Sequence, residues 1–481
     1  MDFLDSKKKK AHRIRLFIGY ALMAVALSMS TVLIVLLTSG YDINRTTGAI
    51  IQNGLAIIDA HPEAADIFIN GKPQGQTSQR LFLAEGNYDV KLQRAGYRDW
   101  SHKITLEGST IEQLVYPFLF PTNLKTTTLK TYDSKPPLIS QSPDRRWLVE
   151  QEVGKFGAFE LVDLNDIKNP RSELVLPSDT VTAAPGEHIF KEVEWSADNT
   201  NLLIEHSWPT GTEYILLNRN NALQSLNVSK LFPDQAGFRI SLRSKRSDQF
   251  YLYNPATKSL MSGVANTKVA TAILAHAVQF KTYKEDTIIY INESKEVHLL
   301  QKDKDYAIRT MPDAPSYLLD YAEFNGKAYL VCGSPTDGHT YVYEDPLISL
   351  TRVPAKTPQP LRVLIVNKPE YVSFSTIARF VAVQSGSKFA VFDAETGRQF
   401  RYDTSLSVTA GQKATWMDGH RLALVANSKL NVFDFDGANS QQLGSILPLS
   451  QPYFNRDYDA FFTFSSNSSK VDMQRAELLV K

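Results

Sequence analysis

Cysteine is almost absent from this sequence: among 481 residues there is only Cys332. No internal disulfide can form, so stability must come from burial of a core, which a chain of this length can supply. Cys332 lies in the apolar run KAYLVCG. This context predicts a buried strand thiol and not a nucleophile.

An excess of one charge is also absent. The chain has 52 Lys and Arg against 51 Asp and Glu, a net charge of +1. Such a balance argues against nucleic acid as the main partner. The one marked imbalance lies in residues 1–15, where six basic and two acidic residues give a net charge of +4.

Motifs for chemistry are missing as well. The nine histidines are scattered, with no two within ten residues, and the sequence has no H-E-x-x-H, no cysteine pair and no G-x-S-x-G. It also has no Walker or dinucleotide-binding glycine pattern. The sequence therefore predicts no catalytic, cofactor-binding or metal-binding residue, and we expect the protein not to be an enzyme and to need no cofactor.

No charged residue occurs between Arg15 and Asp42. Within this gap, Leu16–Leu37 are 22 residues that would span about 33 Å as a helix, enough to cross a bilayer. We predict an uncleaved transmembrane helix at residues 16–38, with the basic tail 1–15 in the cytoplasm and the remainder outside the cell membrane. A cleaved signal peptide, the alternative, would have a shorter apolar core and a small-x-small cleavage site.

After a connector at residues 39–54, short strands and turns follow. Polar and apolar residues alternate in DIFINGK, and turn residues recur in NGKPQG, AEGN and RAGY. About five short strands in some sixty residues predict a small β-sandwich.

This segment resembles the PEGA domain. The matching features are Pro62-Glu63-Ala64-Ala65, then IFINGKPQGQT, LAEGNYDVKL and AGYRDW, over about residues 55–118. Ala64 stands where the family has glycine. The resemblance implies a non-catalytic module of a prokaryotic envelope protein. Tyr97 and Trp100 are expected to pack its core.

Residues 119–481 repeat a pattern of short apolar strands and polar turns, with starts roughly 38–54 residues apart, which is typical of propeller blades. SPDRRWLV, WSADNTNLLI and WMDGHRLALV resemble the repeat of TolB-type and WD40-like propellers, in which an aromatic-Ser-x-Asp-Gly turn joins the inner two strands. We count eight units, with seven left open. The fold class is therefore all-β with one N-terminal transmembrane helix: a PEGA-like β-sandwich followed by a β-propeller.

Two structural details are predicted for the propeller. The final unit lacks its outermost strand, and Thr122–Asp133 would supply it and close the ring. Trp147, Trp195 and Trp416 occupy similar places in their units and are expected to wedge between blades.

The function expected from this organisation is binding. The chain would be a membrane-anchored scaffold whose propeller contacts an envelope protein or a surface polymer. The loops least like hairpins are VLPSDTVTAAPGEH, HSWPTGTEY and VPAKTPQPLRVLIVNKPEY. They supply the predicted partner contacts Trp208, Pro209, Pro358 and Pro360. The alternatives are a propeller enzyme with a site in the central channel and a sensor acting through a membrane partner.

Overall fold

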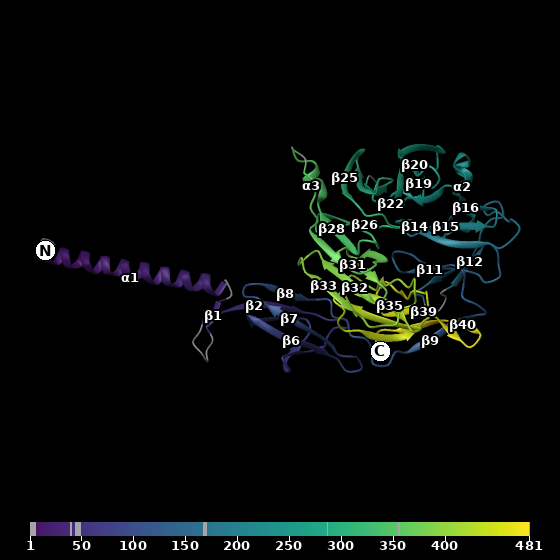
Figure 1. Ribbon diagram of the computed structural model, residues 1–481. Coiled ribbons are helices and arrows are strands. Elements are labelled where there is room, and N and C mark those ends of the chain that lie inside the picture. Colours follow the sequence, from purple (N-terminus) through teal and green to yellow (C-terminus); the bar gives the residue numbers. More distant parts are fainter. Residues whose placement is uncertain are drawn as a thin grey trace. The chain divides into compact units, whose positions relative to one another are not determined.

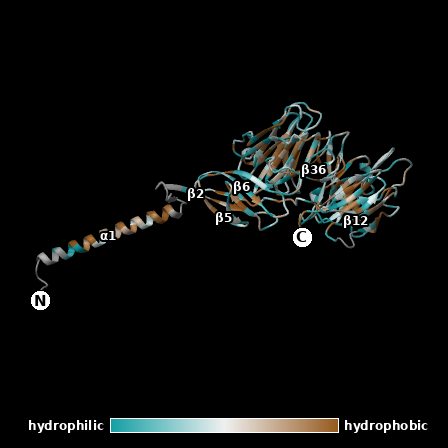
Figure 2. Cartoon of the chain, turned by 90° about the horizontal axis from the view of Figure 1, so that it is seen from below, coloured by the Kyte–Doolittle hydropathy of each residue, from teal (hydrophilic) through white to brown (hydrophobic). Residues whose placement is uncertain are grey.

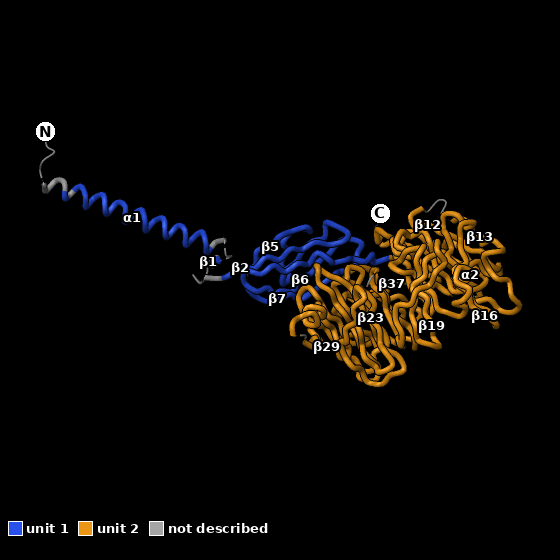
Figure 3. Tube along the Cα trace, turned by 90° about the horizontal axis from the view of Figure 1, so that it is seen from above, with its two compact units in different colours: residues 1–123, 480–481 blue, residues 124–479 orange. Residues whose placement is uncertain are grey.

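The computed structural model describes residues 6–38, 41–43, 50–166, 171–285, 287–354 and 356–480 (Figure 1). The chain divides into two compact units, residues 1–123 with 480–481 and residues 124–479 (Figure 3). Parts of two predicted segments lie outside the described residues, namely 1–5 of the basic tail and 39–40 and 44–49 of the connector.

Helix α1 (Ser6–Thr38) contains the predicted membrane segment. Its stretch His12–Leu36 has a mean hydropathy of 2.1 and is exposed along its whole length. Hydrophobic colours predominate along this helix in Figure 2. The segment contains no proline and is rich in Leu, Ala and Met, which favours a continuous helix. The chain thus has an N-terminal helix long and apolar enough to cross a membrane.

The rest of unit 1 is a sandwich of two small sheets. Its strands are β1 (Tyr41–Ile43), β2 (Ile50–Ile58), β3 (Asp66–Ile69), β4 (Lys72–Gln76), β5 (Gln79–Ala84), β6 (Gly86–Gln93), β7 (Trp100–Leu106) and β8 (Ile111–Leu114). One sheet has the order β4-β3-β6-β7. In the other, β2 pairs antiparallel with β1 and β5 and parallel with β8.

The described residues of the sandwich form eight strands where five were predicted. Strand β1 lies in the predicted connector, β2 begins there, and β4 falls on the predicted turn NGKPQG. Asn53-Gly54 looks like a turn in sequence, but here Gly54 is inside a strand. A Cβ on Gly54 would lie 2.6 Å from the Leu106 side chain, so the glycine permits close packing of the two sheets. Tyr97 and Trp100 are buried in the sandwich core, as predicted.

The described residues of unit 2 form eight four-stranded antiparallel sheets, numbered here 1 to 8. The strands of sheets 1 to 4 are β10 (Ile139–Gln141), β11 (Trp147–Gln151), β12 (Ala158–Asp163), β13 (Arg171–Val175); β14 (Ile189–Trp195), β15 (Asn201–Trp208), β16 (Gly211–Asn218), β17 (Leu226–Asn227); β18 (Arg239–Leu242), β19 (Gln249–Asn254), β20 (Ser259–Val264), β21 (Val269–Leu274); and β22 (Ala277–Tyr283), β23 (Thr287–Asn292), β24 (Glu296–Gln301), β25 (Lys304–Thr310).

Sheets 5 to 8 continue the pattern. Their strands are β26 (Leu318–Phe324), β27 (Lys327–Gly333), β28 (His339–Glu344), β29 (Arg362–Ile365); β30 (Tyr371–Phe374), β31 (Phe380–Ser385), β32 (Lys388–Asp393), β33 (Gln399–Asp403); β34 (Thr415–Trp416), β35 (Arg421–Ala426), β36 (Lys429–Asp434), β37 (Gln441–Ser445); and β38 (Tyr453–Phe454), β39 (Ala460–Asn467), β40 (Lys470–Glu477), β9 (Thr126–Tyr132). Short helices α2 (Val228–Leu231) and α3 (Pro346–Leu350) and 3-10 turns η1 (Ala222–Gln224), η2 (Pro233–Gln235) and η3 (Arg243–Lys245) lie in the connections.

Ring closure occurs as predicted. Strand β9 pairs antiparallel with β40, so a segment from the start of unit 2 completes the last sheet. This pairing removes an open sheet edge and ties the two ends of the propeller sequence together.

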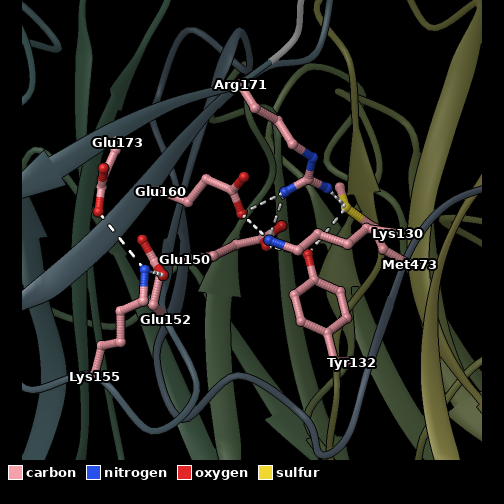
Figure 4. A network of polar contacts seen from close by, with 9 residues as sticks. All are labelled: Lys130, Tyr132, Glu150, Glu152, Lys155, Glu160, Arg171, Glu173 and Met473. Atoms are coloured by element: carbon pink, nitrogen blue, oxygen red, sulfur yellow. Dashed lines mark hydrogen bonds and ion pairs between the residues drawn. The ribbon is translucent and has the colours of Figure 1, made fainter.

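A buried ionic network joins the closing strand to sheet 1 (Figure 4). The Tyr132 hydroxyl donates to Glu150, and Arg171 lies 2.8 Å from Glu160 and 3.4 Å from Glu150. Burial raises the pKa of Glu150, and Arg171 opposes that shift. Lys130 adds a second cation beside Glu160. The network therefore links β9 to three strands of sheet 1.

The Ser-x-Asp turns join the first and second strands of their sheets, as predicted. In sheet 2 the Ser196 hydroxyl donates to Asp198 and accepts a 2.9 Å hydrogen bond from the Asn201 amide. Sheet 1 repeats both bonds around Ser142. The turn thus closes on its own side chains, which explains its recurrence.

The three tryptophans are not equivalent, which corrects the prediction. The Trp195 and Trp416 indole N–H groups donate to serines of the preceding sheets, at 2.7 and 3.1 Å, so these two do join neighbouring blades. Trp147 instead begins a second strand, and the Arg146 and Arg219 guanidinium groups lie 4.6 and 4.4 Å from the centre of its ring. In sheet 1 the place before the turn serine belongs to Gln141, whose amide donates to the Phe454 carbonyl at 2.8 Å.

Cys332 is fully buried in β27, as predicted, and burial raises its pKa to about 12. At neutral pH it is a protonated thiol and an unreactive core residue.

The two ends of the sheets carry different connections. Since the strands alternate in direction, the connections between sheets and those between second and third strands lie at one end, called here the linker face. The turns between first and second strands and between third and fourth strands lie at the other end, the turn face. This division decides which loops can form one surface.

Candidate interaction site

Trp208 ends β15 at the linker face. It pairs with Gly211 across the turn Pro209-Thr210, which leads into β16. A Cβ on Gly211 would lie 2.5 Å from the indole ring, so only glycine leaves room for the ring to lie over the turn. Trp208 is half-buried and Pro209 is exposed.

The Trp208 indole continues a row of aromatic rings. Its centre lies 5.1 Å from that of His206, which stacks on Phe190 at 4.3 Å with an interplanar angle of 9°. The His188 ring lies 5.1 Å from that of His206, and the Phe156 ring lies 4.5 Å from that of His188. The rings come from β15, β14, the linker before β14 and the β11–β12 loop, so this cluster joins sheets 1 and 2.

Two of these rings, those of His206 and His188, also belong to a chain of hydrogen-bonded polar groups. His206 Nδ1 lies 2.9 Å from Glu213 Oε1, and His206 Nε2 lies 2.8 Å from His188 Nδ1. The far nitrogen of His188, Nε2, lies 2.8 Å from the Ala184 carbonyl oxygen. His206 and Glu213 face each other directly across β15 and β16.

Glu213 also holds the inter-sheet linker in place. Its oxygens accept hydrogen bonds from the Thr182 amide at 2.8 Å, the Thr182 hydroxyl at 2.7 Å and the Asn227 side chain at 2.7 Å. Burial by itself would raise the pKa of Glu213, but these bonds and the one from His206 outweigh it and lower the pKa to about 2. Glu213 is therefore a carboxylate at neutral pH.

The hydrogen-bond partners fix two ring hydrogens in this chain. The ionised Glu213 requires a hydrogen on His206 Nδ1, and the Ala184 carbonyl requires one on His188 Nε2. The carboxylate and the carbonyl thereby orient both rings.

Apolar side chains, all exposed except half-buried Trp208, lie at the same end of sheets 1 and 2 as the ring cluster and include two of its rings. We call this surface the apolar rim: Val153, Phe156, Val175, Ile189, Trp208 and Pro209. Phe156 is 42% exposed, and Val153, Val175 and Ile189 are also exposed. Because all six lie in or beside connections of the linker face, sheets 1 and 2 present them on the same side. The predicted contacts Trp208 and Pro209 belong to this rim.

The structure places the other two predicted contacts elsewhere. Pro358 is buried and Pro360 is half-buried, in the loop between β28 and β29 of sheet 5. That loop joins a third to a fourth strand and so lies at the turn face. Trp208 and the two prolines therefore do not form one surface, and Pro358 is not accessible to a partner.

Sequence reasoning missed His188, His206 and Glu213. They are 18 and 7 residues apart, a spacing that matches no ligand or catalytic motif. The available signal was the short turn in HSWPTGTEY, which places His206 opposite Glu213 if it is a two-residue hairpin. In the described part of the chain, no group of three or more His, Cys, Asp or Glu side chains is placed to hold a metal ion.

Residues 54–115 match the PEGA domain family, in agreement with the resemblance found in the sequence. The chain therefore carries a PEGA domain followed by a β-propeller. No curated protein sequence matches the chain.

The solved structures similar to this chain are β-propellers. Dihydro-heme d1 dehydrogenase NirN, solved in complex with DHE, is 13% identical, with a TM-score of 0.42 over 65% of this chain and 66% of that one. Oligogalacturonate lyase, solved in complex with manganese, is 12% identical, with a TM-score of 0.40 over 74% and 98%. The propeller domain of Myceliophteria thermophila Cps50 (Swd1) is 10% identical, with a TM-score of 0.39 over 74% and 100%. The chain spans about two thirds of the length of NirN.

These similarities correct one prediction. We expected the protein not to be an enzyme because the sequence contains no recognisable catalytic motif. The similar propellers include a dehydrogenase and a lyase, so the prediction that excluded catalysis is wrong. Identities of 12–13% assign neither activity to this chain.

Proposed function

We propose that this protein is a single-pass membrane protein of a prokaryotic envelope whose propeller docks another envelope protein through the apolar rim. The observation that carries the proposal is the rim itself, in which apolar side chains of two sheets, five of them exposed, lie at the same face as a buried hydrogen-bonded chain.

The anchor and its orientation support an extracytoplasmic location. Helix α1 is apolar from Leu16 onward, and six basic residues precede that point. Positive charge beside a membrane helix favours the cytoplasmic side, so both folded units would lie outside. The PEGA match at residues 54–115 agrees with an envelope protein.

The composition of the rim favours a protein partner. Exposed apolar patches ringed by polar residues mark interaction sites, and Trp and other aromatic side chains supply much of the binding energy at protein interfaces. Val153 and Ile189 make the surface around the rings aliphatic. A surface polymer would gain less from such aliphatic contacts than a protein side chain would.

Site-specific photocrosslinking in intact cells tests the proposal. A photoreactive amino acid replaces Phe156 in the full-length, membrane-anchored chain. The matched control replaces Leu223, which is 78% exposed in the η1 turn of sheet 2, at the turn face. We expect one protein to crosslink at position 156 and not at 223.

Three outcomes would contradict docking at the rim: equal crosslinking at both positions, attachment only to polysaccharide, or no product at position 156. The orientation is checked separately by adding protease to cells whose outer envelope layers have been made permeable but whose cell membrane is intact. Digestion of the propeller with survival of a tagged N-terminus supports it. Digestion of the N-terminus with survival of the propeller contradicts it.

A further inference from the structure

A second feature of the linker face is a cavity of about 300 Å³ far along the chain from the apolar rim. Three consecutive linkers form it: those that lead into the first strands of sheets 7, 8 and 1. Its polar lining includes Lys135, Gln412, Lys413, Thr415, Ser450 and Tyr453. Ligand pockets in proteins start at about this volume, which is large enough for a sugar-sized molecule.

The charge of the cavity is one-sided. Two lysines line it and no aspartate or glutamate does. Lys135 donates a 2.8 Å hydrogen bond to the Ser450 hydroxyl, and the Lys413 ammonium lies 5.9 Å from the centre of the Tyr371 ring. Among the ion pairs of the described residues, none involves Lys135 or Lys413.

The surroundings disfavour two ammonium groups here. Both lysines are solvent-exposed as whole residues, but their partial burial still lowers the pKa of Lys135 and of Lys413. The positive charge of Lys281 lowers the pKa of Lys413 further, while Asp320 opposes this effect. Since Lys281 and Asp320 pair at 3.2 Å, the carboxylate is already largely neutralised. A bound anion would relieve this unfavourable charge.

The walls of the cavity are held rigidly. Gln412 is buried, and its side chain accepts a 2.8 Å hydrogen bond from the Leu449 amide and donates one of 3.1 Å to the Ser450 carbonyl. These two bonds tie the linker of sheet 7 to that of sheet 8. Little ordering cost therefore opposes binding.

We propose that this cavity binds a small ligand carrying a carboxylate or phosphate group, with Lys135 and Lys413 as its counter-charges. The Ser450 hydroxyl would donate a further hydrogen bond to the same anion. This is a site distinct from the apolar rim, and it does not depend on the proposed docking function.

Titration of the full-length chain in detergent tests the proposal. Inorganic phosphate, glucose 1-phosphate and glucuronate are added separately, glucose serves as the neutral probe, and binding is followed by calorimetry. We expect saturable binding of at least one anion and none of glucose. Whether the phosphate probes or glucuronate bind more tightly identifies the anionic group.

Variants connect the binding to the cavity. Lys135→Met and Lys413→Met should each weaken binding at least tenfold, and Lys413→Arg should retain it within about threefold. Lys429→Met is the matched control, because Lys429 also donates to a serine hydroxyl, at 2.9 Å, but lies outside the cavity. Absence of anion binding up to 10 mM, or equal binding by Lys135→Met, Lys413→Met and Lys429→Met, would overturn the proposal. Crosslinking at position 156 should be the same in all variants.

Discussion

Glu213 is the residue on which the geometry of the apolar rim depends most. Glu213→Gln keeps the size of the side chain but replaces one acceptor oxygen by an amide donor. One oxygen accepts from the Thr182 amide and His206, and the other accepts from the Thr182 hydroxyl and Asn227. Either orientation of the glutamine amide therefore places a donor against a donor.

The size of the effect follows from the pKa. A fall from 4.5 to about 2 corresponds to on the order of 3 kcal/mol of preference for the ionised form in the folded state. The Glu213 side chain is only 6% exposed, but the hydrogen-bonded chain that it starts extends to half-buried His188, where solvent screens charge. We therefore expect Glu213→Gln to cost about 2 kcal/mol of local stability.

Amide hydrogen exchange measures this cost where it arises. The Thr182 amide donates to Glu213, and we expect its exchange to accelerate about 30-fold in Glu213→Gln, because about 1.4 kcal/mol is a factor of ten. Glu205→Gln is the matched control: Glu205 is in the same strand pair and accepts a 2.9 Å bond from Tyr214, but it does not contact the linker.

The pH dependence follows with a definite sign. Since folding lowers the pKa of Glu213, its contribution is complete above about pH 4.5 and is lost as the pH falls toward about 2. Protection of the Thr182 amide, corrected for intrinsic exchange, should fall over that range in the native protein and not in Glu213→Gln. Equal protection in both proteins at pH 6 would refute the assigned role of Glu213.

Two further predictions concern ring closure and the PEGA domain. Arg171→Met should destabilise the propeller by about 3 kcal/mol in chemical denaturation, because it leaves buried Glu150 without its cation. Arg246→Met, at an exposed pair, should cost less than about 1 kcal/mol. Similar losses in the two variants would contradict a special role for ring closure. Ala64→Gly should slow amide exchange in β3 about two- to fivefold, because Ala64 has φ 59°, a left-handed conformation that favours glycine. Ala95→Gly, at an ordinary backbone position, is the control. Slower exchange in that variant would show that the effect is not conformational.

The features recovered from the sequence are those encoded locally. A Ser-x-Asp turn makes its hydrogen bonds within six residues, as around Ser196, so each copy is visible in the sequence. The missing last strand was also a local observation, and β9 supplies it. Trp147 was misassigned because it lies close to a Ser-x-Asp turn, as Trp195 does. It follows that turn, whereas Trp195 precedes its own, and the position before the turn serine of sheet 1 is occupied by Gln141.

The site could be recovered only in part, because its contacts join residues of different elements. Trp208 and Pro209 were found through an unusual loop, but the same reasoning selected Pro358 and Pro360, which a propeller places at the opposite end of the sheets. The composition of a loop does not show whether the loop follows a second or a third strand. Only a correct count of the strands in the sheet shows this. Strand position within the sheet, and not loop character, decides which face a residue occupies.

The same rule connects the rim and the cavity. The rim is built from the linker of sheet 2 and the second-to-third-strand loops of sheets 1 and 2, and the cavity is built from the linkers into sheets 7, 8 and 1. Both therefore lie on the linker face, whose connections can diverge without disturbing the Ser-x-Asp turns that join the first and second strands. The turn face carries the repeated Ser-x-Asp turns, whose side chains are committed to hydrogen bonds within the turn. A propeller of this design stabilises itself at one end and keeps the other end available for recognition.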